Sequence, residues 1–457
     1  MLSRVQDRQL SSFTRHVLPY SPFYRLALKE WPVVRGVQDI GELPFTEKAD
    51  VAPTNESPQR SRQFLLQPNE ALFRQHAPFS WKKLFAQSRF LSDLEYQYAP
   101  VHVHFTTGRT ALPTPFFQTR QDMDTLRETG RRMLAIGGLS RTTRLLNAFP
   151  FAPHLAFWQT ALASEAAGVF ALHTGGGRVL GTERIIEMAK RFESTALVGM
   201  PSYVHHVLSA AVEGSVKLPA LDTLILGGEA VTDRLRSSLK DLAAKLDAKV
   251  RVLSTYGLTE GRCAWMECAE GSGYHLYPDL EVIEVVGKDG KHVGATEAGE
   301  IVCTPIGWRG SVVVRYKTGD VGRLFVGKCP SCGRTVPRIS SDISRTSETR
   351  MLRTKVKGQL VDFEGLADVL RGLPVREWQA VIRRRGKGTF GLDELVLRIA
   401  VQKGASTAKV SGKVVASVRD AMDVTPKVVI VQYQRLVQDL GVERELKQRR
   451  VIDERAA

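Results

Sequence analysis

Three short apolar runs, each leading into a turn, constrain the fold of this 457-residue chain more than any other feature. They are Val169–Leu172, Ala196–Met200 and Leu221–Leu226. The first is followed by a glycine-rich turn and by the helical pattern of Thr182–Phe192. Strands that alternate with helices in this way form a mostly parallel sheet with covering helices. We therefore predict an α/β fold whose ligands bind where the carboxyl ends of the strands open a crevice.

The segments around these turns also carry aromatic and histidine side chains. Phe151, His154 and Tyr203 are candidates for a substrate pocket at that crevice. For each of them, packing in the core is the competing interpretation. The short run Val250–Leu253 predicts one more strand, and the segment that follows it should reach the same edge of the sheet.

A different feature is Val103–Thr114, in which an alternating, strand-like run ends in clustered hydroxyl groups. The residues at the turn are Thr106, Thr107, Gly108, Arg109 and Thr110. Amides and hydroxyls that converge in a tight turn bind anions, as a triphosphate requires. On this segment alone, an ordinary solvated turn is the competing interpretation.

The composition indicates a globular protein, since 43% of the residues are hydrophobic and no apolar run could span a bilayer. No export signal is indicated, so we expect a cytoplasmic protein. The formal charge is +16, which favours binding to nucleic acid, to an acidic membrane surface or to phosphorylated substrates. Nucleic acid is disfavoured, because no helix interleaves basic and aromatic residues and the single Cys-x-x-Cys pair is not repeated.

Cysteine spacing suggests a metal site. Cys329 and Cys332 form a Cys-x-x-Cys pair, while Cys268 and His275 lie seven residues apart. Two thiolates on one tight turn, completed by a cysteine and a histidine, form a closed tetrahedral zinc site of the structural type. Free buried thiols are the alternative. Cys263 is a substitute ligand for Cys268.

Four segments, taken in order, resemble the nucleotide-binding motifs of phenylacetate-CoA ligases, a branch of the acyl-adenylate-forming superfamily. They are the turn after Val103, then Gly227–Ala230, Ser254–Glu260 and Arg315–Asp320. The opening segments of the chain, Ser21–Arg25 and Leu43–Lys48, resemble the start of the same ligases. Only residues 52–100 stay unassigned. The phosphate turn departs from the family pattern at Arg109, Ala111 and Leu112, which replace Thr, Gly and Lys.

The resemblance implies specific roles for single residues. Tyr256, with Gly257, would stack on adenine, Thr259 would bind phosphate, and Glu260 would bind Mg²⁺. The opposite adenine wall would be Gly228, Glu229 and Ala230, while Asp320 and Arg345 would hold the ribose. Near the end of the chain, Leu446–Asp453 resembles the terminal family motif and places Lys447 at the catalytic lysine, although the preceding glycine is absent. One more cation in a basic tail is the alternative for Lys447.

Residues 340–348 are mostly polar, which predicts a linker between two domains. We therefore expect an N-terminal adenylate-forming (AMP-binding) domain, 1–345, and a C-terminal lid, 346–457. The lid is predicted as a small α+β domain. Its expected elements are strands at Glu377–Arg383, Leu395–Val401 and Val428–Tyr433 and a helix at Thr407–Met422. The family hinge is matched only in part by Ser344–Glu348.

The resemblance implies that a carboxylic acid, aryl or arylalkyl, reacts with MgATP to give an acyl-adenylate, and that the acyl group then passes to the thiol of CoA. A carrier-protein thiol or an amine is the alternative acceptor. A degenerate homologue that only binds nucleotide, and a basic zinc-containing nucleic-acid-binding protein, are the other classes considered. A homodimer is one open option for the assembly.

Overall fold

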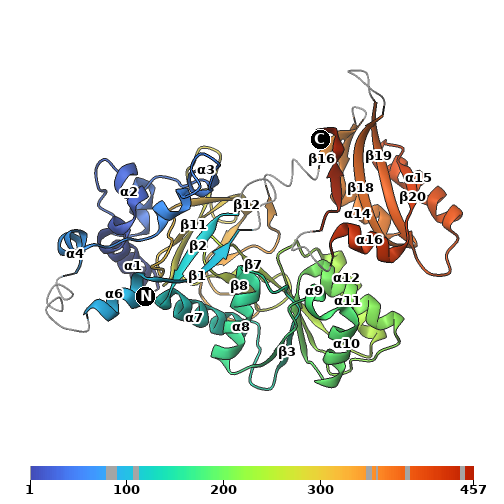
Figure 1. Ribbon diagram of the computed structural model, residues 1–457, viewed down its shortest axis with the longest axis horizontal. Coiled ribbons are helices and arrows are strands. Elements are labelled where there is room, and N and C mark those ends of the chain that lie inside the picture. Colours follow the sequence, from blue (N-terminus) through green and yellow to red (C-terminus); the bar gives the residue numbers. More distant parts are fainter. Residues whose placement is uncertain are drawn as a thin grey trace. The chain divides into compact units, whose positions relative to one another are not determined.

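The structure is a computed structural model that describes residues 2–78, 90–106, 113–345, 353–356, 359–385, 392–442 and 448–456 (Figure 1). The chain forms two compact units, Met1–Ile343 and Ser344–Ala457. The observed division therefore lies two residues before the predicted boundary at 345. Within the described part of the chain, every helix is too short or too polar to cross a lipid bilayer.

The centre of the first unit is a nine-stranded sheet with the order β13-β14-β9-β8-β7-β6-β5-β3-β4. Its parallel strands are β3 (Arg144–Asn147), β4 (Phe170–His173), β5 (Ala196–Gly199), β6 (Thr223–Gly227) and β7 (Arg251–Gly257). The antiparallel part comprises β8 (Ala264–Glu267), β9 (Tyr274–His275), β13 (Leu324–Phe325) and β14 (Arg338–Ile339). Every residue of β5 and β6 is buried, as expected for parallel strands that are covered on both faces.

The helices alternate with these strands. They are α7 (Arg120–Ile136), α8 (Leu155–Ala167), α9 (Gly177–Leu180), α10 (Thr182–Arg191), α11 (Pro201–Glu213) and α12 (Asp233–Lys245). A capping box between Thr119 and Asp122 starts α7, and Gly168 ends α8 in the left-handed conformation. The predicted helix Thr182–Phe192 matches α10 to within one residue. Strand β7, however, runs past the predicted end at Leu253 as far as Gly257, because its far half pairs with β8.

A hairpin and a second sheet complete the first unit. The hairpin consists of β1 (Pro100–Phe105) and β2 (Pro115–Thr119), and the sheet pairs β10 (Glu281–Val286), β11 (Gly299–Pro305) and β12 (Tyr316–Gly322). The helices at the start of the chain are α1 (Leu2–His16), α2 (Pro22–Ala27), α3 (Lys48–Val51), α4 (Glu70–His76) and α6 (Phe90–Tyr98). Short 3₁₀ turns lie at Leu18–Tyr20, Val37–Glu42 and Arg60–Phe64. The described residues of the unassigned stretch, 52–78 and 90–100, therefore contain two helices and a turn.

The N-terminal segment is joined to the start of β12. Thr46 donates its amide to the carbonyl of Arg315, and Lys317 donates its amide back to Thr46. The Thr46 hydroxyl is buried and donates to the Val314 carbonyl at 2.7 Å. Arg315 has a positive φ of 44° and lies over the ring of Phe45, with its guanidinium carbon 3.9 Å from the ring centroid. Residues near position 46 therefore form part of the sheet that contains β12.

The second unit packs helices against a four-stranded sheet of order β20-β19-β18-β21. Its elements are β15 (Ser344–Arg345), β16 (Arg353–Val356), β17 (Gln359–Asp362), α14 (Phe363–Arg371), β18 (Val375–Arg385), β19 (Leu392–Val401), α15 (Thr407–Met422), β20 (Lys427–Ile430), α16 (Tyr433–Leu440), β21 (Val451–Asp453) and the 3₁₀ turn Glu454–Ala456. The predicted helix Thr407–Met422 is correct at both ends. The predicted strand Val428–Tyr433 is wrong in its last part, since β20 ends at Ile430 and Tyr433 begins α16, whose buried face the prediction overlooked.

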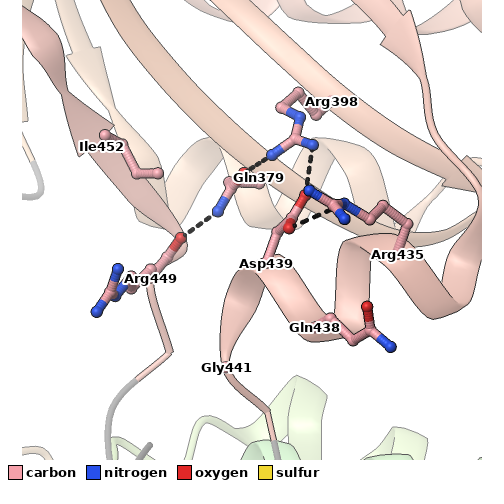
Figure 2. A pocket seen from close by; sticks show the side chains of 8 residues that line it. All are labelled: Gln379, Arg398, Arg435, Gln438, Asp439, Gly441, Arg449 and Ile452. Carbon is pink, nitrogen blue, oxygen red and sulfur yellow. Dashed lines mark hydrogen bonds and ion pairs between the residues drawn. The ribbon is translucent and has the colours of Figure 1, made fainter.

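A polar network ties the strands of this unit to the segment that leads into β21 (Figure 2). The buried Gln379 donates from Nε2 to the carbonyl of Arg449 at 2.8 Å and accepts a hydrogen bond from Arg398. Arg398 also pairs with Asp439 on α16 at 2.6 Å, and Arg435 pairs with the same carboxylate. These side chains line a cavity of about 530 Å³. The network thereby fixes the backbone just after residue 447.

Candidate functional site

The turn after β6 and the end of β7 lie side by side at the carboxyl edge of the sheet, where Gly227 is in register with Thr255. A Cβ atom at Gly227 would overlap the Thr255 hydroxyl, so this close approach requires glycine. Gly228 has a φ of 89°, which also favours glycine. The carboxylate of Glu229 accepts hydrogen bonds from the amide and hydroxyl of Ser202, at 3.0 and 2.9 Å. Glu229 thereby anchors the predicted adenine wall, Gly228–Ala230, to the first turn of α11.

Tyr256 and Asp320 are brought into direct contact. The Tyr256 hydroxyl donates to Asp320 Oδ2 at 2.8 Å, and its ring packs beside Trp265 and Tyr274. Burial, reinforced by the Asp320 charge, raises the pKa of Tyr256 well above its ordinary value. The backbone of Asp320 is fixed by a hydrogen bond from its amide to the Thr318 hydroxyl. The residues predicted to bind adenine and ribose therefore occupy one place.

The Thr259–Glu260 turn lies against the hairpin of the predicted phosphate loop. Thr259 Oγ1 donates to the carbonyl of Phe105 at 3.5 Å, and Tyr316 donates to Glu260 Oε1 at 3.0 Å. A carboxylate oriented in this way offers hard oxygen atoms of the kind that Mg²⁺ prefers. The hydrogen bond from Thr259 to Phe105 joins the third predicted nucleotide motif to the first, across 154 positions of sequence.

The base of the phosphate hairpin is closed by two hydrogen bonds. Thr106 donates its amide to the Thr114 carbonyl at 3.0 Å, and Thr114 donates its amide to Thr106 Oγ1 at 3.2 Å. Four predicted phosphate-binding residues lie outside the described part of the chain, and so does the predicted catalytic lysine; they are Thr107, Gly108, Arg109, Thr110 and Lys447. Arg345 ends β15, and its side chain also lies outside the described residues.

A buried charged network that the sequence did not predict supports both of these segments. Arg262, which is fully buried and has a φ of 74°, donates from Nη2 to Asp122 at 3.0 Å and to Gln118 Oε1 at 2.9 Å. The amide of Gln118 then donates to His104 Nδ1 at 2.6 Å. Burial is the main cause that lowers the pKa of His104 to about 3, so this imidazole is neutral. The network links β1, β2, α7 and the turn after Glu260.

The three pocket candidates lie in different environments. Phe151 is 63% exposed, and His154 is half-buried, with Nδ1 3.4 Å from the Phe105 carbonyl. Tyr203 is only 4% exposed, and its hydroxyl lies 3.3 Å from that of Thr182 on α10. His154 therefore lies against the strand that leads into the phosphate hairpin, and Phe151 packs beside Phe157 and Trp158 of α8. Tyr203 instead packs between helices.

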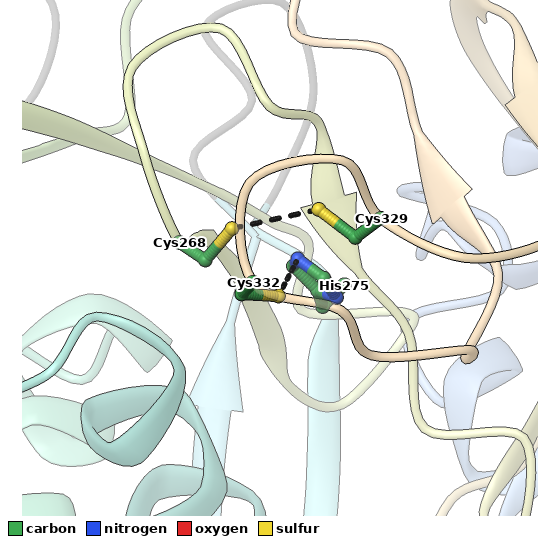
Figure 3. A group of neighbouring side chains, drawn as sticks. All are labelled: Cys268, His275, Cys329 and Cys332. Carbon is green, nitrogen blue, oxygen red and sulfur yellow. Dashed lines mark hydrogen bonds between the residues drawn. The ribbon is translucent and has the colours of Figure 1, made fainter.

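The four predicted metal ligands converge (Figure 3). Cys268 follows β8, His275 lies in β9, and Cys329 and Cys332 lie in the turn between β13 and β14. Their ligand atoms all lie within 4.8 Å of one another. Cys268 Sγ is 3.7 Å from Cys329 Sγ, and Cys332 Sγ is 3.6 Å from His275 Nε2. Cys263 is not part of this group and instead contacts Glu281.

Comparison with known proteins shows which enzymes the chain resembles. The sequence model of the family described as AMP-binding enzyme matches residues 81–307. Phenylacetate-coenzyme A ligase of Thermus thermophilus is 27% identical over 414 residues, covering 88% of this chain and 82% of that protein. The phenylacetate-coenzyme A ligase of Escherichia coli is 24% identical, covering 67% of this chain and 68% of that protein. Residues 81–307 of this chain thus match the family of AMP-binding enzymes.

Over most of its length the chain is similar in sequence to phenylacetate-coenzyme A ligases. The fold is also similar to that of a solved ligase. The crystal structure of 2-hydroxyisobutyryl-CoA ligase in complex with R3-HIB-AMP superimposes with a TM-score of 0.72 at 20% identity, covering 100% of this chain and 89% of that one.

Proposed function

We propose that this protein activates a carboxylic acid with ATP, giving an acyl-adenylate and pyrophosphate, and then transfers the acyl group to the thiol of CoA. The observation that carries this proposal is the convergence of the predicted nucleotide motifs in the first unit. Tyr256 contacts Asp320, and Thr259 contacts the strand that leads into the phosphate hairpin. Relatives named phenylacetate-coenzyme A ligase support the same reaction.

The geometry suggests how the first step would proceed. A carboxylate oxygen of the substrate attacks the α-phosphorus of ATP and forms a new P–O bond to it. Pyrophosphate leaves with the electrons of the P–O bond that breaks. Asp320 would accept hydrogen bonds from the ribose hydroxyls, while Gly228–Ala230 and the Tyr256 ring would hold the adenine. Glu260 would hold Mg²⁺, which when bound offsets negative charge on the phosphate oxygens. In the second step the thiolate sulfur of CoA, formed by loss of the thiol proton, attacks the acyl carbon, and AMP leaves with the electrons of the broken C–O bond.

For the domains, we infer that residues 1–345 form the AMP-binding domain and that residues 346–457 form a lid carrying the catalytic Lys447. Lys447 would supply a cation to the α-phosphate during adenylation only. The network of Gln379, Arg398 and Asp439 supports this assignment, because it fixes the Arg449 carbonyl two residues after Lys447. A carrier-protein thiol in place of CoA is the alternative acceptor, which product analysis would test. A homodimer is the proposed assembly, which mass measurement in solution would test.

We also propose one structural zinc ion at Cys268, His275, Cys329 and Cys332. A tetrahedron with Zn–S bonds near 2.3 Å has sulfur–sulfur edges of about 3.8 Å and sulfur–nitrogen edges of about 3.6 Å. The observed separations of 3.7 and 3.6 Å fit those edges. With four protein ligands the ion would have no open position, so its role would be to hold β8, β9 and the 329–332 turn together. Five free cysteines support a reducing, cytoplasmic location.

The direct test of the function is a panel of carboxylic acids incubated with MgATP, with and without CoA. The expected result is acid-dependent exchange of labelled pyrophosphate into ATP, and formation of AMP and an acyl-CoA when CoA is present. Binding of ATP without exchange for any acid would favour the degenerate, nucleotide-binding alternative.

A further inference from the structure

A group of aromatic and imidazole rings lies beside the phosphate hairpin, and we call it the histidine–aromatic cluster. Its members are His102, Phe151, His154, Phe157, Trp158 and His173. The ring of His102 is 4.7 Å from that of Trp158, and the Phe157 ring is 5.1 Å from Phe151 and 5.9 Å from His173. Such edge-to-face groups provide apolar walls for an aromatic ring. The proposed function does not otherwise account for the three imidazoles.

The location of the cluster fits the acyl part of the substrate. His173 is the last residue of β4. In the order of the sheet, β3 and β4 lie on one side of β5, and the strands with the nucleotide motifs, β6 and β7, lie on the other. His154 lies next to the carbonyl of Phe105, which is also the acceptor for Thr259. A substrate whose carboxylate lies at Thr259 can therefore extend its tail along this face of the sheet edge. Phe151 and His173 are both exposed there.

Hydrogen bonds fix which nitrogen of each imidazole can serve a ligand. Asn147 accepts from the Phe149 amide through Oδ1 at 3.1 Å, so its Nδ2 must donate to His173 Nδ1. When neutral, His173 therefore carries its proton on Nε2 and offers a donor. His154 Nδ1 faces a carbonyl and must donate to it, which leaves Nε2 as an acceptor.

Charge also limits the ligand. Partial loss of water contact, at the sides where these rings pack against their neighbours, lowers the pKa of His102, His154 and His173, so all three are neutral near pH 7. Among the described residues, His102 Nε2 has no hydrogen-bond partner although the atom is buried. Neutral donors and acceptors among aromatic rings suit a neutral polar group and do not compensate a buried charge.

We propose that the substrate is an aromatic carboxylic acid with a neutral hydroxyl or amino substituent on its ring, recognised by His154 and His173. This inference rests on the proposed function and adds the substrate class. A hydroxyl group can donate to His154 Nε2 and can accept from His173 Nε2–H. An unsubstituted ring would leave these imidazole atoms without partners once the ligand excludes water, and that loss disfavours it.

The test compares matched acids in the complete chain. Benzoate, phenylacetate and cinnamate are each compared with their ring-hydroxylated, ring-aminated and ring-carboxylated analogues, with aliphatic acids included. The expected result is a kcat/KM for the hydroxylated or aminated member that is about tenfold or more above the unsubstituted one. Preference for unsubstituted, carboxylated or aliphatic acids overturns the substrate class while leaving the ligase function intact. Inactivity with every acid counts instead against the proposed function.

Variants locate the recognition. His154→Phe and His173→Phe should each reduce the ratio of kcat/KM for the hydroxylated acid to kcat/KM for the unsubstituted acid about five- to tenfold, the effect of losing one hydrogen bond. His173→Gln, which keeps an N–H donor, should retain the preference. His205→Phe on α11 is the matched control, since its imidazole bonds Ser238 outside the cluster. An unchanged preference in both phenylalanine variants, judged folded by thermal melting, overturns the assignment.

Discussion

Tyr256 and Asp320 lie 64 positions apart in sequence, yet the phenol of one donates a 2.8 Å hydrogen bond to the carboxylate of the other. The pair joins the nine-stranded sheet to β12, so the residue predicted to stack on adenine also orients the residue predicted to hold ribose. Since burial and the Asp320 charge raise the pKa of Tyr256, the phenol remains a donor throughout the neutral range.

Removing the two members of this pair should have different effects. Tyr256→Phe keeps the ring and loses one hydrogen bond, so we expect a loss of roughly 1 kcal/mol in the free energy of unfolding and a small change in the KM for ATP. Asp320→Asn should raise the KM for ATP about tenfold or more, because a carboxylate that accepts two hydroxyl protons is lost. Steady-state kinetics with ATP and with 2′-deoxy-ATP checks this. If Asp320→Asn bound both nucleotides normally, the ribose role would be wrong.

Glu260→Gln should weaken pyrophosphate exchange by roughly a hundredfold or more, because a neutral amide is a poorer ligand for Mg²⁺ near the reacting phosphates. The variant should also need more magnesium for half-maximal rate. Glu297→Gln, in the exposed turn between β10 and β11, is the control and should leave both quantities unchanged. A Glu260→Gln enzyme with normal magnesium dependence would contradict the assignment.

The purified chain should contain about one zinc ion, and Cys332→Ser should lose it. We expect removal of the metal by a chelator to lower the melting temperature by roughly 5 °C or more, since metal-binding energy contributes to folding. Cys303→Ala is the matched control, because Cys303 is a buried cysteine of β11 outside the metal group. Elemental analysis and thermal melting decide the point. Protein purified without chelator and found free of zinc would refute it.

Lys447→Ala should suppress adenylate formation by roughly a hundredfold and leave transfer from a supplied acyl-adenylate to CoA almost unchanged. A residue that stabilises only one transition state affects only that half-reaction when it is removed. Lys403→Ala, an exposed lysine in the turn before α15, is the control. Equal loss of both half-reactions would indicate a structural role, and no loss would return Lys447 to the solvated tail.

Glu281 predicts a pH effect on stability. This buried carboxyl accepts from Trp265 and from the Tyr277 amide, and burial raises its pKa from 4.5 to about 8. The folded chain therefore binds a proton that the unfolded chain releases between these values. Stability from this group is complete below pH 4.5 and is lost as the pH rises through about 8. In Glu281→Gln, urea midpoints measured from pH 5 to 8 should decline less steeply. An identical decline in both proteins would contradict the prediction.

The sequence predicted those elements that depend on patterns among neighbouring residues. The parallel strands, the helix Thr407–Met422 and the cysteine–histidine group follow from hydrophobic periodicity or from fixed spacing. The last part of the strand predicted at Val428–Tyr433 was wrong, because an apolar run continues into the buried face of α16 without a glycine or proline between them.

The buried network of Arg262 shows what sequence could not supply. Its partners Asp122 and Gln118 lie 140 and 144 positions away, and no local motif marks them. Only the capping box that includes Asp122 has a sequence signature, and that signature indicates the start of a helix. Nothing in the sequence indicated that the same carboxylate also receives a guanidinium. Contacts of this kind arise from the topology of the whole unit.

The bonds between Thr46 and Arg315–Lys317 have a consequence for the order of events during synthesis. The early segment emerges from the ribosome about 270 residues before the strand that it must join. Until then the amide and carbonyl of Thr46 lack the partners that they have at the start of β12, so this part of the sheet cannot form while the chain is still short. Translation at 5–20 residues per second would make this wait roughly 15–50 seconds. Chaperone demand for this protein should therefore be greatest while residues 50–315 are being made, and a pause introduced in that interval should lower the yield of soluble chain.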